Sequence, residues 1–504
     1  MTLHQLSIRH YRGAAFAASL CGAFRLLAQV PFELDTDYRT TIEARNVNAV
    51  HLLPDGKLFL SGQIRYPGEG LTFRGSMRLL FNGERDPLFQ SFPFSTGGGP
   101  IIPWNDGKFY VQAGGVVRRL HPDGAIDQSF AFFGDDPYVS PSSVGGYHVF
   151  PDGRVVTSGD HLLSDIARGF VGQYNWVWFT NTGRLDTTRI HRQANFPTGR
   201  FTALPNGQFI CHGQGSSFDG QAVDKLFKLN ADGSVDTSFQ SGVYWGVVKS
   251  YATLADNRFY AGGSFMTDQL PGDSITIARF LPNGSIDPSF AIPEFDLGEL
   301  TQTFGPQVFK IVPLPNGNII AAGKFQFVNG QPRGGICLLD SNGVLLDAFA
   351  NASVGTYVYM NYEYTFISDV VIDSANNYLY LCGAYVGYSD GTTSDPTQRF
   401  VTRLHLGDIM TGTAGGHEEQ AAGIGLRIHP NPSGGQFILT VGGPPMKDAR
   451  MIVHDMTGRA VHRSRMEAYM NGGGHAFSLD VPAGLYRVTV QYDGGKHSAT
   501  LVVE

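Results

Sequence analysis

The sequence is poor in basic charge, in cysteine and in long apolar runs. Its 504 residues carry 37 Lys and Arg against 44 Asp and Glu, a formal net charge of −7. There is therefore no overall basic field to attract nucleic acid or an anionic membrane surface. After the first thirty residues no stretch is long and apolar enough to span a bilayer. The sequence predicts neither a nucleic-acid partner nor a membrane span.

Cysteine is scarce, with four in the whole chain. Cys21 lies in the N-terminal segment, which leaves Cys211, Cys337 and Cys382. An odd number of cysteines cannot all pair within one chain, and no metal-binding Cys or His spacing accompanies them. We interpret the three as small buried apolar residues.

Familiar catalytic motifs are also missing. The chain has no HExxH, no GxSxG, no phosphate-binding Gly-rich loop and no dinucleotide fingerprint. His148, His161, His191 and His212 are scattered without ligand spacing. We therefore assign no catalytic residue, no cofactor and no metal ligand. Folding could still bring distant residues together, so an enzyme is not excluded.

What the sequence does contain is an internal repeat. LNADGSVDTSF at 229–239 has close copies at 120–130 and 280–290, and weaker copies at 79–89, 178–189 and 338–349. A second element precedes each copy, as in PDGKLFLSG at 54–62 and PNGNIIAAG at 315–323. The unit recurs seven times with a period of roughly 45–60 residues, in the range typical of solenoids and propellers.

Each unit predicts four antiparallel strands. Asp-Gly and Asn-Gly between apolar runs favour tight hairpins, because both central turn residues need positive φ. Seven such meanders predict an all-β, seven-bladed β-propeller over residues 29–406, since radial repetition leaves only short sheet edges. The seventh unit lacks the Asp-x-x-Phe tail, and FELDTDY at 32–38 supplies one. We expect this N-terminal strand to close the last blade.

The units resemble the delta-60 repeats, a bacterial β-propeller family, over about Phe32 to Leu406. The Asp/Asn-Gly hairpins and the DGSVDTSF-like tails carry the resemblance. It is specific for the repeat family and says little about the ligand.

The flanking segments differ from the repeats. Residues 1–28 have a basic start and a short apolar core, which is typical of a secretory signal peptide. Residues 407–423 are small, polar and Gly-rich and predict a flexible linker. Residues 424–504 alternate apolar and polar positions and predict a small Ig-like antiparallel sandwich.

The C-terminal segment resembles the sorting domain of the type IX secretion system. HPNPSGGQF at 429–437, VHDMTGRAV at 453–461 and LDVPAGLYRVTV at 479–490 carry the match. Its motif residues are Pro430, Asn431, Pro432, Gly458, Gly484 and Tyr486. The resemblance implies a Bacteroidota-type bacterium, a signal peptide for the first export step, and the type IX machinery as partner. The protein is then secreted or held at the outer-membrane surface.

Acidic residues raise two further questions. One Asp recurs per unit, and we interpret these residues as satisfying backbone N–H groups; they are Asp35, Asp86, Asp127, Asp186, Asp236, Asp287 and Asp347. The recurring Phe is interpreted as core. Loop carboxylates could alternatively hold calcium, though without a loop-ligand pattern; they are Asp135, Asp136, Asp268, Asp273, Asp390 and Asp395.

Topology places the long connections on the face opposite the tight hairpins. Among them are 160–172, 265–274 and 385–396, and variable loops on a rigid scaffold commonly carry binding sites. The most distinctive is TYVYMNYEYTF at 356–366. Its tyrosines offer rigid contact area for a protein or glycan, and we name Tyr357, Tyr359, Tyr362 and Tyr364 as ligand-binding candidates. Alternatively the segment fills a gap between blades. Tyr174, Trp176 and Trp178 are interpreted as core.

Taken together, the sequence predicts an exported, non-catalytic propeller that binds an extracellular protein or glycan. Two alternatives stay open. One is a polysaccharide hydrolase or lyase, which would need two carboxylates facing each other. The other is a purely structural surface component.

Overall fold

The described part of the chain is built from β-strands. The computed structural model describes residues 31–91, 100–113, 115–131, 136–300, 305–407, 426–429, 433–441, 449–455, 459–465, 474–492 and 495–503. Within these ranges there is no α-helix, and two short 3₁₀ turns occur at Asn105–Gly107 (η1) and Ile166–Arg168 (η3). In the part described, no helix could cross a membrane. The chain divides into two compact units, Met1–Gly412 and Thr413–Glu504.

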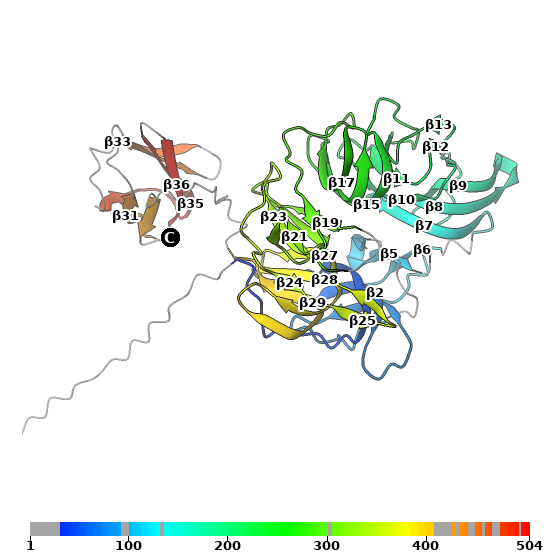
Figure 1. The fold of residues 1–504 in the computed structure, drawn as a ribbon, viewed down its shortest axis with the longest axis horizontal. Coiled ribbons are helices and arrows are strands. Elements are labelled where there is room, and N and C mark those ends of the chain that lie inside the picture. Colours follow the sequence, from blue (N-terminus) through cyan, green and yellow to red (C-terminus); the bar gives the residue numbers. More distant parts are fainter. Residues whose placement is uncertain are drawn as a thin grey trace, which may run out of the picture. The chain divides into compact units, whose positions relative to one another are not determined.

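In the described residues of the first unit, seven main antiparallel sheets follow one another in chain order, and each has a ladder of three strands (Figure 1). These strands are β1 (Ala44–Leu52), β2 (Leu58–Arg65), β3 (Arg74–Leu79); β4 (Ile102–Pro103), β5 (Phe109–Ala113), β6 (Val116–Leu120); β7 (Val139–Val149), β8 (Val155–Asp165), β9 (Phe170–Phe179); β10 (Thr198–Ala203), β11 (Phe209–Gly213), β14 (Leu226–Leu229); β15 (Val243–Thr253), β16 (Phe259–Thr267), β17 (Leu270–Phe280); β19 (Gln307–Pro313), β20 (Ile319–Lys324), β23 (Ile336–Leu339); and β27 (Phe366–Asp373), β28 (Tyr378–Ser389), β29 (Ser394–His405).

Further short strands occur in the connections between the main strands. They are β12 (Ser217–Phe218) with β13 (Gln221–Ala222), β18 (Phe295–Asp296) with β21 (Phe327–Val328) and β22 (Gln331–Pro332), β24 (Ser353–Val354) on β28, and β25 (Tyr357–Tyr359) with β26 (Tyr362–Tyr364).

The Asp/Asn-Gly hairpins form as the sequence predicts. Between β1 and β2, the N–H of Leu53 donates to the carbonyl of Lys57 at 2.9 Å, and Gly56 has a φ of 79°. In the second turn of the same unit, a Cβ on Gly83 would lie 2.3 Å from the carbonyl oxygen of Arg39. Glycine is therefore required there by close backbone approach as well as by its positive φ of 90°.

The predicted fourth strand is much shorter than expected. After the third strand the chain makes a single bridge, as between Leu79 and Arg85, and the same bridge recurs in five other units. The chain then turns, because the N–H of Phe89 donates to the carbonyl of Asp86. The Asp-x-x-Phe tail is thus a turn that inserts the Phe into the core, where Phe89 is 5 % exposed, and a continued ladder does not form.

Some connections predicted as loops are extensions of strands. β8 continues to Asp165 and β9 begins at Phe170, so most of 160–172 is paired. β16 and β17 likewise extend to the turn between Thr267 and Leu270. The extension of β8 alternates buried and exposed positions from His161 to Asp165, as a strand with one face covered does.

The N-terminal segment pairs with the seventh sheet. Leu34 bridges Leu404 in β29, and the N–H of Phe32 donates to the carbonyl of His405 at 2.7 Å. Asp35 binds Arg403 at 2.7 Å. This segment occupies the place that the Asp-x-x-Phe tail holds in other units, as the sequence predicts.

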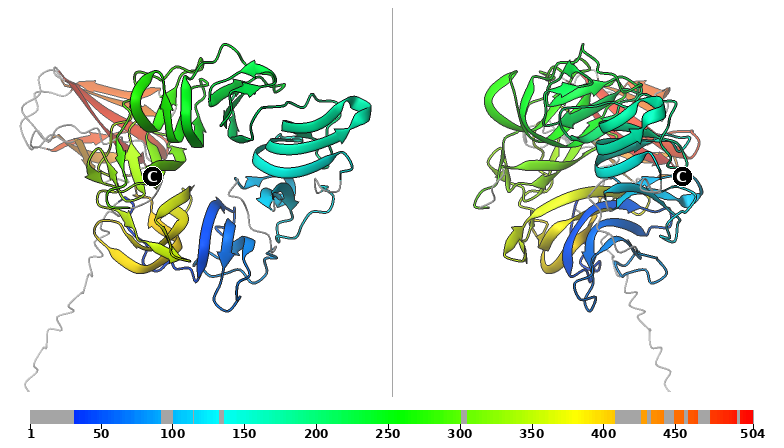
Figure 2. Two further views of the ribbon diagram at one scale, coloured as in Figure 1. Left: turned by 45° about the vertical axis from the view of Figure 1, so that its right-hand side comes forward. Right: turned by 90° about the vertical axis from the view of Figure 1, so that its right-hand side faces the viewer.

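Hydrophobic clusters join each sheet to the next around the unit. One cluster contains residues of β2, β5 and β6, and others join each later pair in chain order. A further cluster joins the last sheet to the first, with Cys382 and Val401 against Val47 and Leu58. Figure 2 accordingly shows the yellow strands of the seventh sheet beside the blue strands of the first.

The second unit consists of two antiparallel sheets. One has the order β30 (Leu426–His429), β31 (Gln436–Val441), β34 (Gly474–Ser478); the other has β33 (Ala460–Arg465), β32 (Arg450–Asp455), β35 (Gly484–Tyr492), β36 (Gly495–Val503). Both sheets contribute to one core that includes Leu439, Met451, Val488 and Leu501. The seven strands predicted from alternation are present, within about three residues at each end.

Candidate functional site

The recurring Asp forms an ion pair with a basic side chain, and this pair has a structural role. In the second unit Asp127 Oδ1 accepts the N–H of Ser129 at 2.9 Å, as the sequence predicts, while Oδ2 binds Arg119 of β6 at 2.7 Å. The Arg119 guanidinium also lies over the ring of Phe130, 5.1 Å from its centroid. Equivalent pairs join Arg78 to Asp86, Lys228 to Asp236, Arg279 to Asp287 and Arg403 to Asp35.

In four of these pairs, at Asp86, Asp127, Asp236 and Asp287, the carboxyl pKa is lowered. Burial opposes the shift at Asp127, but hydrogen bonds from Ser129, Lys108 and Arg119 outweigh it, so its pKa lies far below the usual value. At Asp236 the corresponding bonds lower the pKa to about 2. The basic partner, eight positions before the Asp, is visible in the sequence, but only the strand pairing shows that the two meet.

The first strands of the sheets meet around one cavity. Its volume is about 230 Å³. The first strands of six sheets line it, together with Pro100, which precedes β4 of the remaining sheet. The lining residues are Asn48, Ala49, Pro100, Gly145, Gly146, Tyr147, Arg200, Phe201, Thr202, Lys249, Ser250, Tyr251, Phe309, Lys310, Ser368 and Asp369. We call this the axial cavity.

A β-bulge presents these residues to the cavity. The register between the first and second strands shifts at the lining positions of all six strands, for example between Val248 and Ser250 around Lys249. A bulge leaves one residue without a ladder partner and re-aims its side chain. A glycine within the second strand fits this bend, because a Cβ on Gly263 of β16 would lie 2.1 Å from the carbonyl oxygen of Val247.

Charged side chains gather on one part of the axial cavity wall. Lys310 Nζ lies 2.7 Å from Asp369 Oδ1, and Asp369 Oδ2 accepts the N–H of Val50 at 3.1 Å. Arg200 Nη1 donates to the backbone carbonyl of Lys249 at 3.0 Å, and the charge of Arg200 lowers the pKa of Lys249, so the two cations lie near each other. Three cationic side chains therefore face a single carboxylate among the lining residues.

Two of these cations have lowered pKa values. Burial lowers the pKa of Lys249, and the neighbouring Arg200 lowers it further. Burial also lowers the pKa of Arg200, although Asp369 and Tyr251 oppose the shift. Arg200 remains exposed to solvent and Lys249 is partly buried. Burial is the main cause of both shifts, and a neighbouring positive charge adds to it at Lys249.

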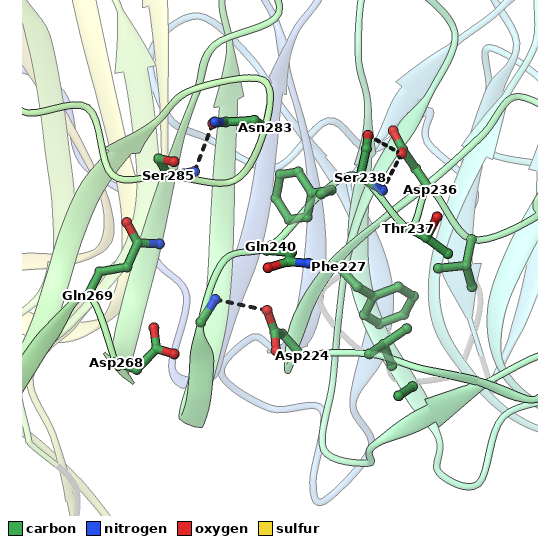
Figure 3. Close-up of a pocket in the computed structure, with 15 residues that line it drawn as sticks. Asp224, Phe227, Asp236, Thr237, Ser238, Gln240, Asp268, Gln269, Asn283 and Ser285 are labelled. Atoms are coloured by element: carbon green, nitrogen blue, oxygen red, sulfur yellow. Dashed lines mark hydrogen bonds between the residues drawn. The ribbon is translucent and has the colours of Figure 1, made fainter.

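A larger, open pocket of about 670 Å³ lies beside the fourth and fifth sheets (Figure 3). Its polar groups are engaged in holding the chain. Asp224 Oδ2 accepts the N–H groups of Ser241 and Gly242 at 3.0 and 2.8 Å. Gln269 Nε2 donates to the carbonyl of Ser241 at 2.7 Å, and Asp236 binds Lys228. The polar groups of this pocket therefore hold two neighbouring repeats together.

The four candidate tyrosines lie on one hairpin with different exposures. Tyr357, Tyr359 and Tyr364 pack with a cluster between the seventh and first sheets, and Tyr364 accepts a hydrogen bond from Arg45 at 3.1 Å. Tyr362 is 70 % exposed, next to Met360, which is also 70 % exposed. The hairpin fills the gap between two sheets and leaves Tyr362 available on its outer side.

The remaining candidates are placed as follows. Trp176, Trp178 and Tyr174 are buried, which confirms their core assignment. Cys211, Cys337 and Cys382 are buried and free, and burial raises the pKa of Cys337 to about 12. Burial lowers the pKa of each of His161, His191 and His212 to about 4, and it lowers that of His148 as well.

The predicted calcium ligands do not converge on one place. Asp136 and Asp390 accept backbone N–H groups at 2.7–2.8 Å, and Asp395 binds Arg39 at 2.8 Å. Asp268 lies on the pocket of Figure 3. Asp135 and the side chain of Asp273 lie outside the described residues. Among the residues described, no group of three His, Cys, Asp or Glu is placed to hold a metal ion.

Of the sorting-motif residues, Gly484 begins β35, and Tyr486 is 6 % exposed with its hydroxyl donating to the carbonyl of Pro482 at 2.7 Å. Pro430, Asn431, Pro432 and Gly458 lie outside the described residues, as do the signal peptide and nearly all of the predicted linker.

The axial cavity residues escaped the sequence analysis. They stand seven or eight positions before the positive-φ residue of the first tight turn: Lys249 precedes Asn257 by eight, and Arg200 precedes Gly207 by seven. Aligning the repeats on that turn would have put Arg200, Lys249, Lys310 and Asp369 together. The signal was missed because these residue types vary between units.

Comparison with known families identifies the repeats. The profile of a family described as "Domain of unknown function (DUF5122) beta-propeller" matches residues 204–239, 254–290 and 314–345. Each match runs from the first tight turn of a unit to its tail. The first unit is a β-propeller domain. No match to a curated protein is found.

Several solved structures are distantly similar to the chain. A protein of unknown function from Bacteroides caccae is 13 % identical, over 57 % of this chain and 92 % of its own, with a TM-score of 0.32. A gluconolactonase from Xanthomonas campestris is 14 % identical, over 73 % and 96 %, with a TM-score of 0.33. A protein of unknown function from Bacteroides thetaiotaomicron is 10 % identical, over 74 % and 99 %, with a TM-score of 0.28.

Proposed function

We propose that this protein is an exported, non-catalytic binding module: a seven-bladed β-propeller of the delta-60 type followed by a type IX sorting domain. The observation that carries the binding role is the axial cavity, to which the first strands of six sheets contribute. The clusters that join successive sheets, and the last sheet to the first, support a closed ring. A closed ring holds its bulged first strands rigidly, as a preorganised site requires.

The segments at the two ends of the chain carry the signals for the proposed export route. Residues 1–28 act as the signal peptide, 407–423 as the linker, and 424–504 as an Ig-like sorting domain that the type IX machinery reads. The separate core of the second unit supports this division. The propeller is then released or retained at the outer-membrane surface, where its partner is an extracellular protein or glycan.

The charge distribution favours binding over glycoside hydrolysis. A hydrolase needs a carboxylic acid of raised pKa opposite a second carboxylate, at about 5–9.5 Å. Within the described residues, each carboxyl group with a resolved shift has a lowered pKa, as at Glu69 and Asp395. The axial cavity has Asp369 as its one carboxylate, and Lys310 neutralises it. A purely structural surface role is the remaining alternative.

The binding role is tested with the recombinant propeller, residues 29–406, on an array of glycans and extracellular matrix or surface proteins, with and without calcium. We expect a saturable interaction. Tyr359→Ala and Tyr362→Ala test the aromatic hairpin as the contact surface. A blank array from folded protein would overturn the binding role and favour the structural alternative.

Export is tested separately. Residues 424–504 are fused to a fluorescent protein that carries a signal peptide, and the fusion is expressed in a bacterium with a working type IX system. We expect fluorescence in the medium or on the cell surface, and retention in the periplasm when the last strand, residues 495–503, is deleted. Equal export of both fusions would contradict the sorting role.

A further inference from the structure

The axial cavity is electrostatically biased. Arg200 and Lys249 lie near each other, and Lys310 lies at the same wall. Asp369 offsets one of these three charges, so the described lining carries an excess of two positive charges. The half-buried His51 interacts electrostatically with Asp369. Burial lowers the pKa of His51, so this side chain adds no positive charge at neutral pH. The pocket of Figure 3 has the opposite bias, with three aspartates in its lining.

Placing like charges together is unfavourable unless something offsets it. The net charge of the chain is −7, so a basic cavity does not follow from average composition. Arg200 and Lys249 stand at the bulges of β10 and β15, and Lys310 follows the bulge of β19, where it pairs with Ala322 in the ladder. The cationic side chains therefore reach the cavity from three different sheets.

We propose that the axial cavity binds a small anionic ligand, or the anionic end of a larger one, through a carboxylate or phosphate-type group held by Arg200 and Lys249. This inference rests on the proposed binding function and gives its ligand a chemical class. The planar guanidinium of Arg200 supplies paired N–H donors that match a carboxylate or phosphate, and the Lys249 ammonium supplies a point charge.

The cavity size restricts the ligand further. Its volume of about 230 Å³ is below the roughly 300–1,000 Å³ of pockets that enclose drug-sized ligands. One acidic monosaccharide or a comparable anion fits this space. Lys310 pairs with Asp369 at the same wall, while Tyr147 and Phe201 supply apolar wall.

Isothermal titration calorimetry on the full mature chain tests the proposal. D-glucuronate is the carboxylate probe, D-glucose its neutral match, and inorganic phosphate and sulfate are the other arms. We expect saturable binding of glucuronate or phosphate, no detectable binding of glucose, and weakening as NaCl is raised, because screening reduces the attraction. The anion that binds most tightly identifies which anionic group the natural ligand carries.

Variants locate the site. Arg200→Gln and Lys249→Gln should each weaken anion binding by about tenfold or more. Arg200→Lys should retain part of the affinity, because it keeps the charge and loses the paired donors. The matched control is Arg154→Gln, at an exposed turn where Arg154 pairs with the exposed Asp152. The melting temperature of each variant establishes that it is folded.

Two results would overturn the proposal: folded wild-type protein that binds none of the anions, or anion binding that Arg200→Gln and Lys249→Gln leave unchanged. If the anions fail while the array gives a specific partner, the anionic ligand is wrong and the binding module stands. If both fail, the binding function falls too.

Discussion

At the scale of single residues, the structure turns a repeat signature into a set of ion pairs. The sequence suggested that each recurring Asp satisfies local N–H groups, and it does so at Asp127 and Asp287. The second carboxylate oxygen takes a cation from the third strand, and that cation lies over the recurring Phe. Asp, a basic residue and Phe therefore pack together in four of the repeat units, at Asp86, Asp127, Asp236 and Asp287.

Breaking one such pair should be costly. Asp127→Asn leaves Arg119, which is 5 % exposed, without its charge partner. Removing one member of a buried pair typically destabilises a protein by about 3–5 kcal/mol. Asp152→Asn, in an exposed pair, should cost less than about 1 kcal/mol. Urea denaturation followed by tryptophan fluorescence measures both, and equal effects would contradict a structural role for Asp127.

The buried histidines predict a pH dependence. His161 is fully buried with a pKa of about 4, below its usual value of about 6.5. The unfolded chain therefore binds a proton that the folded chain does not, and stability falls as pH drops from about 6.5 to about 4. Asp127 and Asp287, whose pKa values are lowered by their hydrogen bonds and ion pairs, stop contributing to protein stability only at more acidic pH.

Thermal melts at pH 7.5 and pH 5 measure this effect. We expect a lower melting temperature at pH 5, and a smaller difference between the two in His161→Gln, which cannot be protonated. An unchanged difference in the variant would show that His161 does not contribute. His148, which is half-buried at another place, provides a comparison through His148→Gln.

At the scale of elements, three-stranded ladders replace the predicted four-stranded meanders. The third and fourth strands share one bridge before the tail turns inward, as at Leu79 and Arg85. Bulges then decide what the first strands present to the axial cavity. Neither feature follows from alternation, because a bulge shifts the periodicity at one residue only.

The tyrosine hairpin allows a matched test at this scale. Tyr357 is 8 % exposed and packs on Phe400 with ring centroids 4.9 Å apart. Tyr357→Ala should destabilise the propeller by about 3–5 kcal/mol, as for other buried aromatic truncations. Tyr362→Ala should change stability by less than about 0.5 kcal/mol. Chemical denaturation distinguishes them, and a large loss in Tyr362→Ala would contradict the hairpin's placement.

At the scale of the whole molecule, the N-terminal segment completes the seventh sheet by pairing with β29. Phe32, Leu34 and Tyr38 are buried, and Phe32 stacks on Phe349 with centroids 3.7 Å apart. A propeller that begins at Arg39 loses these contacts and the Asp35–Arg403 pair, and it exposes the edge of β29.

We therefore expect a propeller of residues 39–406 to melt at lower temperature than one of residues 31–406, and to be cut faster by protease near β29. A peptide of residues 31–38 added in trans should restore part of the stability by mass action. Identical melting of the two forms would contradict ring closure by this segment.

The sequence by itself determined the repeat, the turn types, the all-β class and the position of the N-terminal strand. These depend on local chemistry, since Asp-Gly and Asn-Gly turns need positive φ and an Asp-x-x-Phe tail is short-range. It also predicted the strands of the second unit through their alternation.

Only the tertiary structure decided what meets at the axial cavity. Arg200, Lys249 and Lys310 are about fifty or more residues apart in sequence and become neighbours because seven sheets pack in order. Likewise, the partner of each recurring Asp depends on strand pairing, and the exposure of Tyr362 against the burial of Tyr357 depends on which sheets flank the hairpin. Burial and long-range pairing are properties of the packed chain, and local pattern does not contain them.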